Sequence, residues 1–393
     1  MRAVVVGAGI AGLTSTIALT AAGVEVEVVE SARQLAEIGA GLSLWPNALA
    51  ALGVLGLEEA VSARGVGLDV GAIRSREGRP AYVWDRPGAL EHLGGVPLMM
   101  HRAELQSVLL DACAGAPIRL GARAVSVGQE PDRCRVVLDS GEVIDADLVV
   151  GADGVRSAVR KSVEPSPPRY AGLTSWRAVI DRPYEDGSSM WVAEGKQFLA
   201  TALARDRTYI SGLLRMPEGE NRATTHWGDV LRTEFQGWDR TVTEAIDAIP
   251  EEGYYRDDIY YRPPVRQMVW GNVALVGDAA HPFTPDLGQG GCQAIEDAVT
   301  LGACLRQSGR LDQALLGYQA SRLARVRPVA RDSRLIGRLM ASRNPLVAST
   351  RIRHALLAWE GPITAARGVN LRHVARHASR QSFLSSLRKP PLP

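Results

Sequence analysis

A glycine-rich turn between two apolar runs opens the chain, and it limits the possible folds more than any other feature. Residues 3–6 are apolar, a GxGxxG run follows at residues 7–12, and apolar side chains then recur at helical spacing as far as Ala22. A second expected strand over residues 24–29 ends at Glu30. Strand, glycine turn, helix and second strand in this order predict a dinucleotide-binding unit within a parallel sheet.

Each key residue of this unit has an expected physical task. Gly7 permits the tight turn, Gly9 lets the backbone approach a pyrophosphate, and Gly12 allows the helix to pack closely on the strand. Glu30 can accept hydrogen bonds from both hydroxyls of an adenosine ribose, and it would repel a 2′-phosphate. The pattern predicts a dinucleotide but does not separate FAD from NAD.

A second glycine-rich stretch, residues 271–305, follows the same logic late in the chain. The apolar run at residues 273–276 predicts a buried parallel strand. Asp278 then places a carboxylate at the carboxyl end of the sheet, where open α/β sheets bind their ligands. Pro282 and Pro285 should keep the next residues extended and delay the following helix. We therefore expect Asp278 to accept hydrogen bonds from sugar-like hydroxyls.

The helix after these prolines starts at a Gly-Gln-Gly-Gly run, residues 288–291. Glycines at a helix start let free N–H groups approach a flat ligand, and the positive end of the helix favours negative charge. A reduced flavin carries negative charge on its pyrimidine edge. The alternative is an ordinary turn between a strand and a helix, and this stretch alone leaves both open.

The composition argues against several other protein classes. The chain has 393 residues, of which 46% are hydrophobic, so it can bury a sizeable core. Its net charge of +2 provides no bulk field for a nucleic-acid partner. No apolar run reaches the roughly 18 residues that a membrane-spanning helix needs. Four cysteines without a CxxC pair predict neither a disulfide framework nor a metal site, and they fit a reducing, cytoplasmic compartment.

The middle of the chain changes pattern. Residues 68–84 are expected to form a hairpin, and residues 174–216 contain several β-type runs joined by short turns. Together they predict an antiparallel sheet beside the α/β domain, which would make a natural wall for an aromatic substrate. Arg177 in this sheet is a weak candidate for binding an anionic or phenolic substrate. A sheet-edge charge is the alternative reading of Arg177, and we favour it slightly.

Arg102 begins another helical pattern. A positive charge in the first turn opposes the helix dipole, so Arg102 is expected to have a phosphate or carboxylate partner. The alternative is a solvated surface charge. Asp153 and Gly154 follow a further buried run, and alone they could be only a turn.

The end of the chain is rich in arginine. A long helix is expected over residues 311–340, and further basic helices over 352–359 and 371–387. A membrane-surface helix, a partner-binding face or an acidic ligand would each explain the charge. A solvated face on a capping helix is the alternative that we favour.

The order of these motifs carries a resemblance. GxGxxG with Glu30, then Asp153-Gly154, then Gly277-Asp278, interleaved with a β-rich segment, resembles the class A flavoprotein monooxygenases of the para-hydroxybenzoate hydroxylase fold. The resemblance covers the chain to about Met340, and residues 277–302 are most similar to FAD-dependent urate hydroxylases and related heteroaromatic hydroxylases.

The resemblance implies an α/β fold with a Rossmann-like FAD-binding domain, an inserted antiparallel substrate sheet and a C-terminal helical segment. The expected FAD-binding parts are residues 1–165 and 266–340. Residues 166–265 would form the substrate domain, joined by the hairpin at about 66–100, and residues 341–393 the C-terminal helices.

The resemblance also implies a set of cofactor contacts. The pyrophosphate would lie on the first glycine run, the ribityl chain near Asp278, the adenine near Val125 and the flavin ring along residues 287–291. Asp153 belongs to a motif linked to both FAD and NAD(P)H, and Pro285 is a weak substrate-site candidate. The residues expected to contact FAD are Gly7, Gly9, Ala11, Gly12, Glu30, Arg33, Ala40, Gly41, Arg102, Val125, Asp153, Asp278, Leu287, Gly288, Gln289, Gly290 and Gly291.

The implied activity is hydroxylation of an aromatic or heteroaromatic small molecule. NADH or NADPH would reduce FAD transiently, and molecular oxygen would react through a flavin hydroperoxide. Two alternatives remain open: a same-fold epoxidase of an isoprenoid or polyketide, and a flavin-binding scaffold or sensor without turnover. The expected partners are therefore the substrate and oxygen, with no nucleic acid, and the protein is expected to be a monomer or a homodimer.

Overall fold

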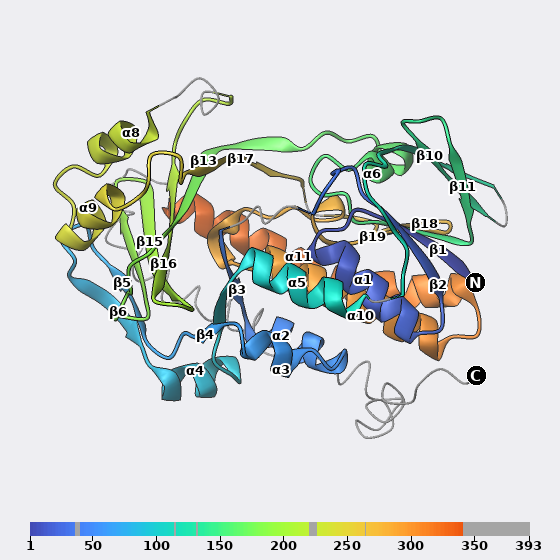
Figure 1. Cartoon of the computed structure of the whole chain (residues 1–393), viewed down its shortest axis with the longest axis horizontal. Coiled ribbons are helices and arrows are strands. Elements are labelled where there is room, and N and C mark those ends of the chain that lie inside the picture. The colour runs from blue at the N-terminus through green and yellow to red at the C-terminus, as the bar shows by residue number, and fades with distance from the viewer. Residues whose placement is uncertain (36–39, 114, 131–132, 220–225, 264, 341–393) are drawn as a thin grey trace.

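The computed structural model describes residues 1–35, 40–113, 115–130, 133–219, 226–263 and 265–340. Figure 1 shows two halves: a layered α/β part that contains the N-terminus and a large sheet at the opposite end. The two halves are joined by long strands and by helices that run between them. The helices predicted at residues 352–359 and 371–387 lie outside the described residues.

The glycine turn at residues 7–12 belongs to a six-stranded sheet. Its strands are β1 (Arg2–Val6), β2 (Glu25–Val29), β8 (Ile118–Arg119), β12 (Leu148–Gly151), β18 (Val269–Trp270) and β19 (Val273–Leu275). The strand order is β18-β19-β12-β1-β2-β8, and only β18 pairs antiparallel to its neighbour. The predicted parallel sheet is therefore confirmed. β1 and β19 lie on either side of β12, so their carboxyl ends meet at one edge.

The β-rich segment forms a seven-stranded sheet, as predicted. Its strands are β5 (Gly71–Arg74), β6 (Pro80–Trp84), β13 (Arg169–Ile180), β14 (Ser188–Ala193), β15 (Lys196–Leu203), β16 (Arg207–Leu214) and β17 (Tyr255–Tyr261). The order is β17-β13-β16-β15-β14-β5-β6, with only β14 and β5 parallel. The early hairpin, β5 and β6, thus extends this sheet. The domain boundaries proposed from the sequence stay predictions.

Two three-stranded sheets complete the β-structure. One consists of β3 (Gly41–Leu44), β4 (Val66–Gly67) and β7 (Leu98–His101), and the other of β9 (Ala124–Gln129), β10 (Cys134–Leu138) and β11 (Val143–Ala146). The first lies between the glycine-rich segments and the seven-stranded sheet, because Gly41 at its edge packs against Tyr209 of β16.

The helices agree with most of the sequence expectations. They are α1 (Ile10–Ala21), α2 (Pro46–Val54), α3 (Glu58–Ser62), α4 (Arg86–Leu93), α5 (Arg102–Ala112), α6 (Ala158–Val163), α8 (Trp227–Glu234), α9 (Arg240–Asp247), α10 (Gly290–Gln307) and α11 (Leu311–Met340). α2 stops at Val54, and α3 follows as a separate helix.

The segment between β19 and α10 also differs from its prediction. It was expected to be extended, but it contains two short 3-10 turns, η1 (Gly277–Ala279) and η2 (Pro285–Leu287). Pro285 is the first residue of η2, where its missing N–H group costs no hydrogen bond. The left-handed conformation of Gly288, with φ of +60°, then ends this turn and allows α10 to begin at Gly290.

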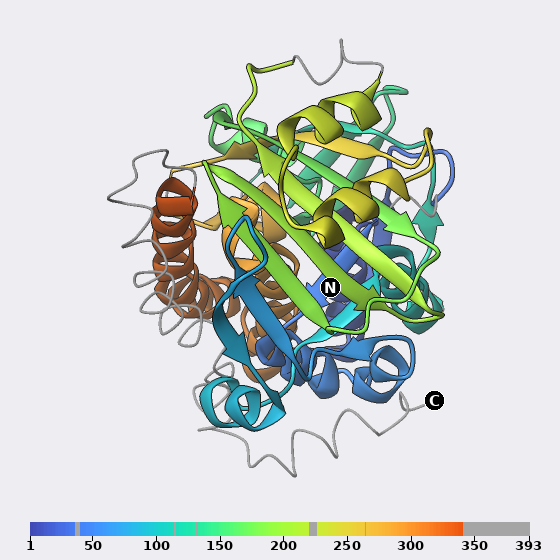
Figure 2. The ribbon, with the colours of Figure 1, turned by 90° about the vertical axis from the view of Figure 1, so that its left-hand side faces the viewer.

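The two faces of the seven-stranded sheet have different partners. Helices α8 and α9 cover the outer face (Figure 2), where Trp176, Trp191 and Phe198 are buried. Their rings pack edge-on or tilted, with Phe198 at 5.6 Å from Phe235 of the helical layer. Because side chains alternate along a strand, the residues between them point to the inner face, towards the glycine-rich segments. The outer aromatic core therefore fixes the sheet against α8 and α9 and leaves its inner face turned towards the glycine-rich segments.

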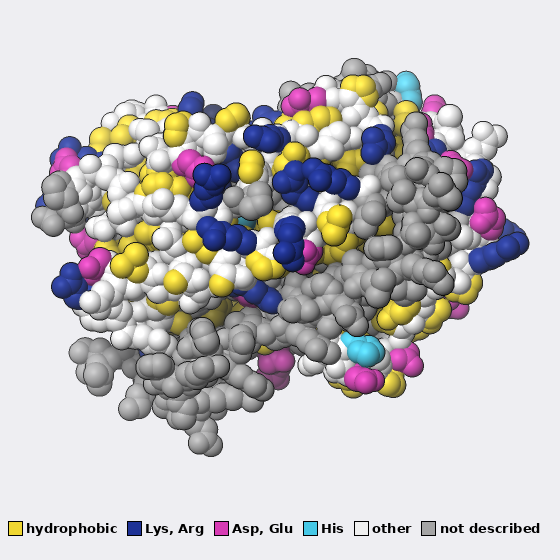
Figure 3. Space-filling model, turned by 180° about the vertical axis from the view of Figure 1, so that it is seen from behind, with side chains coloured by type: hydrophobic (Ala, Val, Ile, Leu, Met, Phe, Trp, Pro, Cys, Tyr) yellow, Lys and Arg dark blue, Asp and Glu magenta, His cyan; other side chains and the backbone are white. Residues whose placement is uncertain are grey.

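The arginines of α11 divide between two environments, which corrects the expectation of one solvated face. Arg322 is 3% exposed and forms ion pairs with Glu296 and Asp297 of α10. Arg331 and Arg338 are exposed, and Figure 3 shows basic side chains gathered across the middle of the face seen from behind. Among the described residues, no helix is long and apolar enough to cross a membrane.

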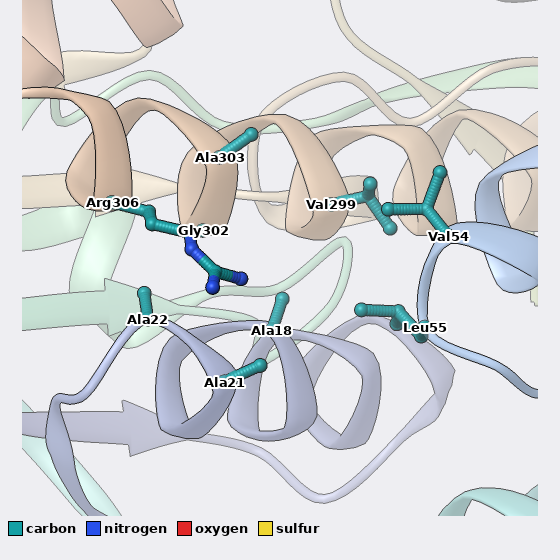
Figure 4. Close-up of a pocket in the computed structure, with 9 residues that line it drawn as sticks. All are labelled: Ala18, Ala21, Ala22, Val54, Leu55, Val299, Gly302, Ala303 and Arg306. Carbon is teal, nitrogen blue, oxygen red and sulfur yellow. The ribbon is translucent and has the colours of Figure 1, made fainter. Parts of the chain in front are cut away.

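Helices α1 and α10 cross at very short distance. A Cβ atom added to Gly302 of α10 would lie 2.6 Å from the carbonyl oxygen of Ala18 in α1. A cavity beside the crossing is lined by small apolar side chains and by Arg306, whose guanidinium points towards α1 (Figure 4). Its lining comes from the later turns of both helices and from the end of α2, so it contains no residue of the two glycine runs.

Replacing Gly302 should therefore disturb the packing that sets the two helices relative to each other. We predict that Gly302→Ala destabilises the protein without FAD by about 1–3 kcal/mol, because backbone cannot yield as a flexible side chain can. Urea unfolding followed by circular dichroism measures this. Gly309→Ala is the matched control, since an added Cβ there has no neighbour within 4 Å. Equal stabilities of the two variants would contradict the prediction.

Candidate active site

The first glycine run has the geometry that its sequence predicts. Gly7 adopts φ of +105°, and an added Cβ there would lie 2.6 Å from the carbonyl oxygen of Ala152. An added Cβ at Gly12 would lie 1.7 Å from the carbonyl oxygen of Gly7. At Gly9 an added Cβ has no neighbour within 4 Å. Gly7 and Gly12 are thus required by close packing, while Gly9 faces open space.

The N-terminus of α1 is open to an anion. Gly9 is its N-cap residue, no side chain caps the helix, and its first turn contains no acid. The free N–H groups and the helix dipole therefore favour negative charge at this position. Glu30 supports the same turn, because its carboxylate accepts hydrogen bonds from the N–H of Ala8 at 2.7 Å and of Ala32 at 2.8 Å. A carboxylate has about four acceptor sites, so Glu30 can still bind ribose hydroxyls.

The N-terminus of α10 repeats this arrangement at the same edge of the sheet. It has no side-chain cap and no acid in its first turn. An added Cβ at Gly290 would have one close neighbour, the Asp278 Oδ1 atom at 4.0 Å. Asp278 is accessible to solvent, yet desolvation raises the pKa of its carboxyl group, against the charges of His281 and Arg102. Both properties fit a carboxylate in a recess between α1 and α10, because an added Cβ at the preceding Gly277 would lie 3.1 Å from Ala11 of α1 and 3.0 Å from Ala294 of α10.

Arg102 brings a positive charge into this recess. It is the exposed first residue of α5, and its N–H donates to the carbonyl oxygen of Ala40. Its charge acts on the pKa of both Asp278 and Arg177, so the three side chains lie near one another. Arg102 forms no ion pair with Asp278 among the described residues, so its expected phosphate or carboxylate partner stays a prediction.

The inner face of the seven-stranded sheet lies opposite these segments. Gly41 has no room for a side chain, because an added Cβ would lie 2.4 Å from the Tyr209 ring and 2.2 Å from Met99. Burial raises the pKa of the Tyr209 hydroxyl. Arg177 lies on the same face, since it pairs in register with Ser211, two residues along β16 from Tyr209.

Arg177 is not the edge charge that the sequence reading favoured. Its strand, β13, lies between β17 and β16, and the Arg177 guanidinium donates to the Asp257 carboxylate. The Arg177 Nε atom is buried and has no hydrogen-bond partner among the described residues. Desolvation lowers the pKa of Arg177. The side chain therefore belongs to the inner wall and forms an ion pair with Asp257.

A polar pair on the same side was not found from the sequence. The Gln197 Nε2 atom on β15 donates to Asp286 Oδ1 at 3.3 Å, while Asp286 Oδ2 is buried and has no partner among the described residues. Desolvation raises the pKa of Asp286. The neighbouring Leu287 belongs to an apolar cluster with Met190 and Val192 of β14. The signal that the sequence offered for Asp286 was its position between Pro285 and the second glycine run.

The comparisons with known proteins agree with this geometry. A profile of the family described as FAD binding domain matches residues 1–252 and 262–333. The aurachin C monooxygenase/isomerase of Stigmatella aurantiaca is 38% identical over 347 residues, covering 86% of this chain and 89% of that protein. The FAD-dependent urate hydroxylase of Klebsiella pneumoniae is 35% identical over 343 residues, covering 85% and 89%. The chain belongs to the FAD-dependent monooxygenases.

The fold comparison supports the same family. The crystal structure of Klebsiella pneumoniae HpxO complexed with FAD and uric acid matches with a TM-score of 0.83 and 30% identity, covering 100% of this chain and 98% of that one. FAD is therefore the resident cofactor of this monooxygenase, and the choice between FAD and NAD is settled. The predicted class A resemblance is confirmed.

The described residues fit FAD in a further respect. Gln289 is 2% exposed and Asn47 is fully buried, yet Gln289 Nε2 and Asn47 Oδ1 have no hydrogen-bond partner among the described residues. Buried polar atoms without partners are rare in native proteins. A donor and an acceptor without partners, beside the start of α10, suit a ligand that presents polar groups along one edge. The pyrimidine edge of a flavin does so.

The other predicted contacts occupy this region or its borders. Asp153 accepts hydrogen bonds at the start of α6 from the N–H of Ala158 at 2.7 Å and of Val159 at 3.1 Å. Its link to NAD(P)H stays a prediction. The individual contacts with FAD also stay predictions. Ala11 lies in the first turn of α1, Ala40 and Gly41 precede or open β3, Leu287, Gly288 and Gly291 flank the start of α10, and Arg33 and Val125 are exposed.

Sequence reasoning also missed Arg160. This arginine is 3% exposed and donates to the carbonyl oxygens of Ala279 and Ala280, directly after Asp278. It connects α6 to the turn that carries Asp278. Its position in a short run after Asp153 gave no sign that the side chain would be buried.

The contrast between the glycines gives a direct test of the pyrophosphate position. We predict that Gly9→Val leaves the unfolding free energy of the protein without FAD nearly unchanged, because the space is open. FAD affinity should fall by about two decades, since the side chain would fill the approach to the α1 N–H groups. Fluorescence titration of FAD into the apoprotein measures the affinity. Gly128→Val, at an exposed glycine with no neighbour within 4 Å, is the control. An unchanged FAD affinity in Gly9→Val would place the pyrophosphate elsewhere.

Proposed function

We propose that this monooxygenase hydroxylates an aromatic or heteroaromatic small molecule, with NADH or NADPH as a transient reductant and molecular oxygen as co-substrate. The pair of Asp286 and Gln197 on the inner side of the sheet carries this proposal. It places a proton acceptor and a neutral hydrogen-bonding amide within an apolar surround. Such a site suits a flat ring that has an acidic O–H or N–H group.

Asp286 is proposed to take a proton from the substrate ring. Electron-rich rings react better with an electrophilic oxygen when an O–H or N–H group loses its proton. A general base works best when its pKa is close to the operating pH, and burial moves Asp286 in that direction. Its partnerless Oδ2 atom has the acceptor capacity that this step needs.

The other residues bind, orient and exclude water. The relatives' names support this kind of substrate, since they include a urate hydroxylase and a 3-amino-4-hydroxybenzoate 2-monooxygenase. FAD, when bound, supplies the activation of oxygen after its own reduction. The start of α10 is proposed to stabilise negative charge on the reduced cofactor, because its N–H groups have no side-chain cap and lie at the positive end of the helix.

A substrate screen tests the proposed function. The FAD-loaded protein is mixed with single aromatic and heteroaromatic compounds, and NADH or NADPH oxidation, oxygen uptake and product mass are measured together. We expect some compounds to stimulate oxidation and to gain one oxygen atom per NAD(P)H consumed. Oxidation that no compound stimulates, with hydrogen peroxide as the product, would contradict the proposal. Turnover restricted to isoprenoid or polyketide alkenes would favour the epoxidase alternative.

Asp286→Asn should separate function from stability. Turnover should fall by about two decades or more, since general-base catalysis is typically worth that much. Stability should rise at neutral pH. A carboxyl with a raised folded-state pKa destabilises the fold once pH exceeds its unfolded value of about 3.9. The advantage of asparagine should therefore grow as pH rises above about 4 and disappear below it.

Unfolding free energies of parent and variant across this pH range, beside steady-state turnover, provide the measurement. Asp186→Asn is the control, because Asp186 is an exposed acid of the same half of the molecule, paired with Arg74. Full activity in Asp286→Asn would remove Asp286 from the proposed mechanism.

A further inference from the structure

Arg322 of α11 lies at the centre of a buried network of charges. Its Nε atom donates to Asp297 Oδ1 at 2.6 Å, and its Nη1 atom donates to Glu296 Oε2 at 2.6 Å. Arg322 is 3% exposed, Glu296 1% and Asp297 0%. Desolvation opposes the ionised form of both carboxyl groups, but nearby positive charge outweighs it and lowers the pKa of each. The network is therefore charged and almost completely enclosed by protein.

The two neighbouring carboxylates reach opposite ends of one segment. Asp297 Oδ2 accepts from the N–H of Gly277 at 2.8 Å and lies 2.6 Å from the Nε2 atom of His281. Gly277 immediately precedes Asp278, and the charge of His281 acts on the Asp278 carboxyl group. Asp297 thus holds the beginning of the segment between β19 and α10.

Glu296 holds the other end of that segment. Glu296 Oε1 accepts from Asn47 Nδ2 at 2.6 Å and from Gln293 Nε2 at 3.0 Å. The same two amides donate to Gln289 Oε1, at 3.1 Å and 3.0 Å. Gln289 is the N-cap residue of α10, and its own amide nitrogen has no partner among the described residues. Through Asn47 and Gln293, Glu296 therefore fixes the orientation of the Gln289 amide.

Stability alone does not account for this arrangement. A buried ion pair returns little net free energy, because desolvating the charges costs about as much as their attraction gains. Apolar side chains would fill the same volume at equal or greater stability. The network instead fixes two polar groups, Asp278 and Gln289, at the recess where FAD is placed. We therefore assign the network the role of orienting Asp278 and Gln289.

We propose that Glu296 and Asp297 are positioning residues with separate tasks: Asp297 sets the Asp278 end for retention of FAD, and Glu296 sets the Gln289 end for the redox properties of the flavin. This inference rests on the proposed position of FAD, with its ribityl chain at Asp278 and its pyrimidine edge at the start of α10. Both carboxylates are buried, at 1% and 0% exposure. Each acts through the backbone or amide groups that it holds.

Two isosteric variants test the separation of tasks. Asp297→Asn sets an amide N–H group against a donor, either the Gly277 N–H or the Arg322 guanidinium. Glu296→Gln does the same against Asn47 and Gln293 or against Arg322. For Asp297→Asn we expect the Kd for FAD to rise by about one to two decades, with the midpoint potential of bound FAD close to the parental value. For Glu296→Gln we expect a lower midpoint potential and flavin reduction slower by about tenfold or more, with FAD affinity changed only a few-fold.

The two variants control for each other, since both remove one carboxylate from Arg322 within the same buried turn. Glu27→Gln, which removes one charge from an ion pair with Arg2 on the six-stranded sheet, is the outside control and should change neither measurement. FAD titration of the apoprotein and dye-coupled reduction of the holoprotein give the two readouts. Variants that change both readouts in the same proportion, or change neither, would overturn the separation of tasks.

Milder variants keep the test decisive if either isosteric variant fails to fold. Asn47→Ala removes one of the two links from Glu296 to Gln289, and His281→Ala removes a partner of Asp297, with all carboxylates retained. We expect Asn47→Ala to lower the midpoint potential and His281→Ala to weaken FAD binding. The reverse assignment, or no difference between them, would overturn the inference. Parental protein that binds no FAD would instead contradict the proposed function itself.

Discussion

The buried pairing of Arg322 with Glu296 and Asp297 is the interaction on which the rest of the structure depends. It ties the last long helix, α11, to the second turn of α10. Tyr318 of α11 adds a hydrogen bond from its hydroxyl to the carbonyl oxygen of Leu275, at the end of β19. Strand, turn and helix start are therefore held from one side by a single helix.

The second constraint is the close crossing of α1 and α10. Because Gly302 has no side chain, the two helices approach to backbone contact. Their N-termini, both without side-chain caps, then open at the same edge of the parallel sheet. One helix start offers N–H groups to a pyrophosphate and the other to the flavin edge. The packing at Gly302 sets the distance between the two helix starts, although it lies away from both of them. A rigid scaffold thus positions the segments that carry function.

The sequence predicted the parts of this structure that depend on local pattern. Gly7 and Gly12 could be interpreted because a tight turn and a close approach each demand glycine, and the long helix over residues 311–340 was also predicted. Arg322 was misread, because an arginine in a basic helix looks the same whether it faces solvent or a buried carboxylate. Its burial depends on the packing of α11 against α10, which no local pattern specifies.

The same limit applies to the substrate side. Alternation along β15 and β16 predicts two faces but does not say which face meets the cofactor. Gln197 and Asp286 are 89 residues apart in the chain, and only the folded sheet brings them together. Arg177 was assigned to an edge because the position of β17 beside β13 requires pairing across a long insertion. Long-range pairing therefore accounts for most of what sequence reasoning missed.

A crystal structure with bound FAD tests the central claim most directly, namely that two open helix starts receive the two ends of one cofactor. We expect the pyrophosphate beside Gly9 at the start of α1, the ribityl chain at Asp278, and the pyrimidine edge at the first N–H groups of α10. The adenosine should extend towards Glu30. FAD bound with its ring away from α10, or with its pyrophosphate away from Gly9, would show that the two helix starts do not receive the cofactor.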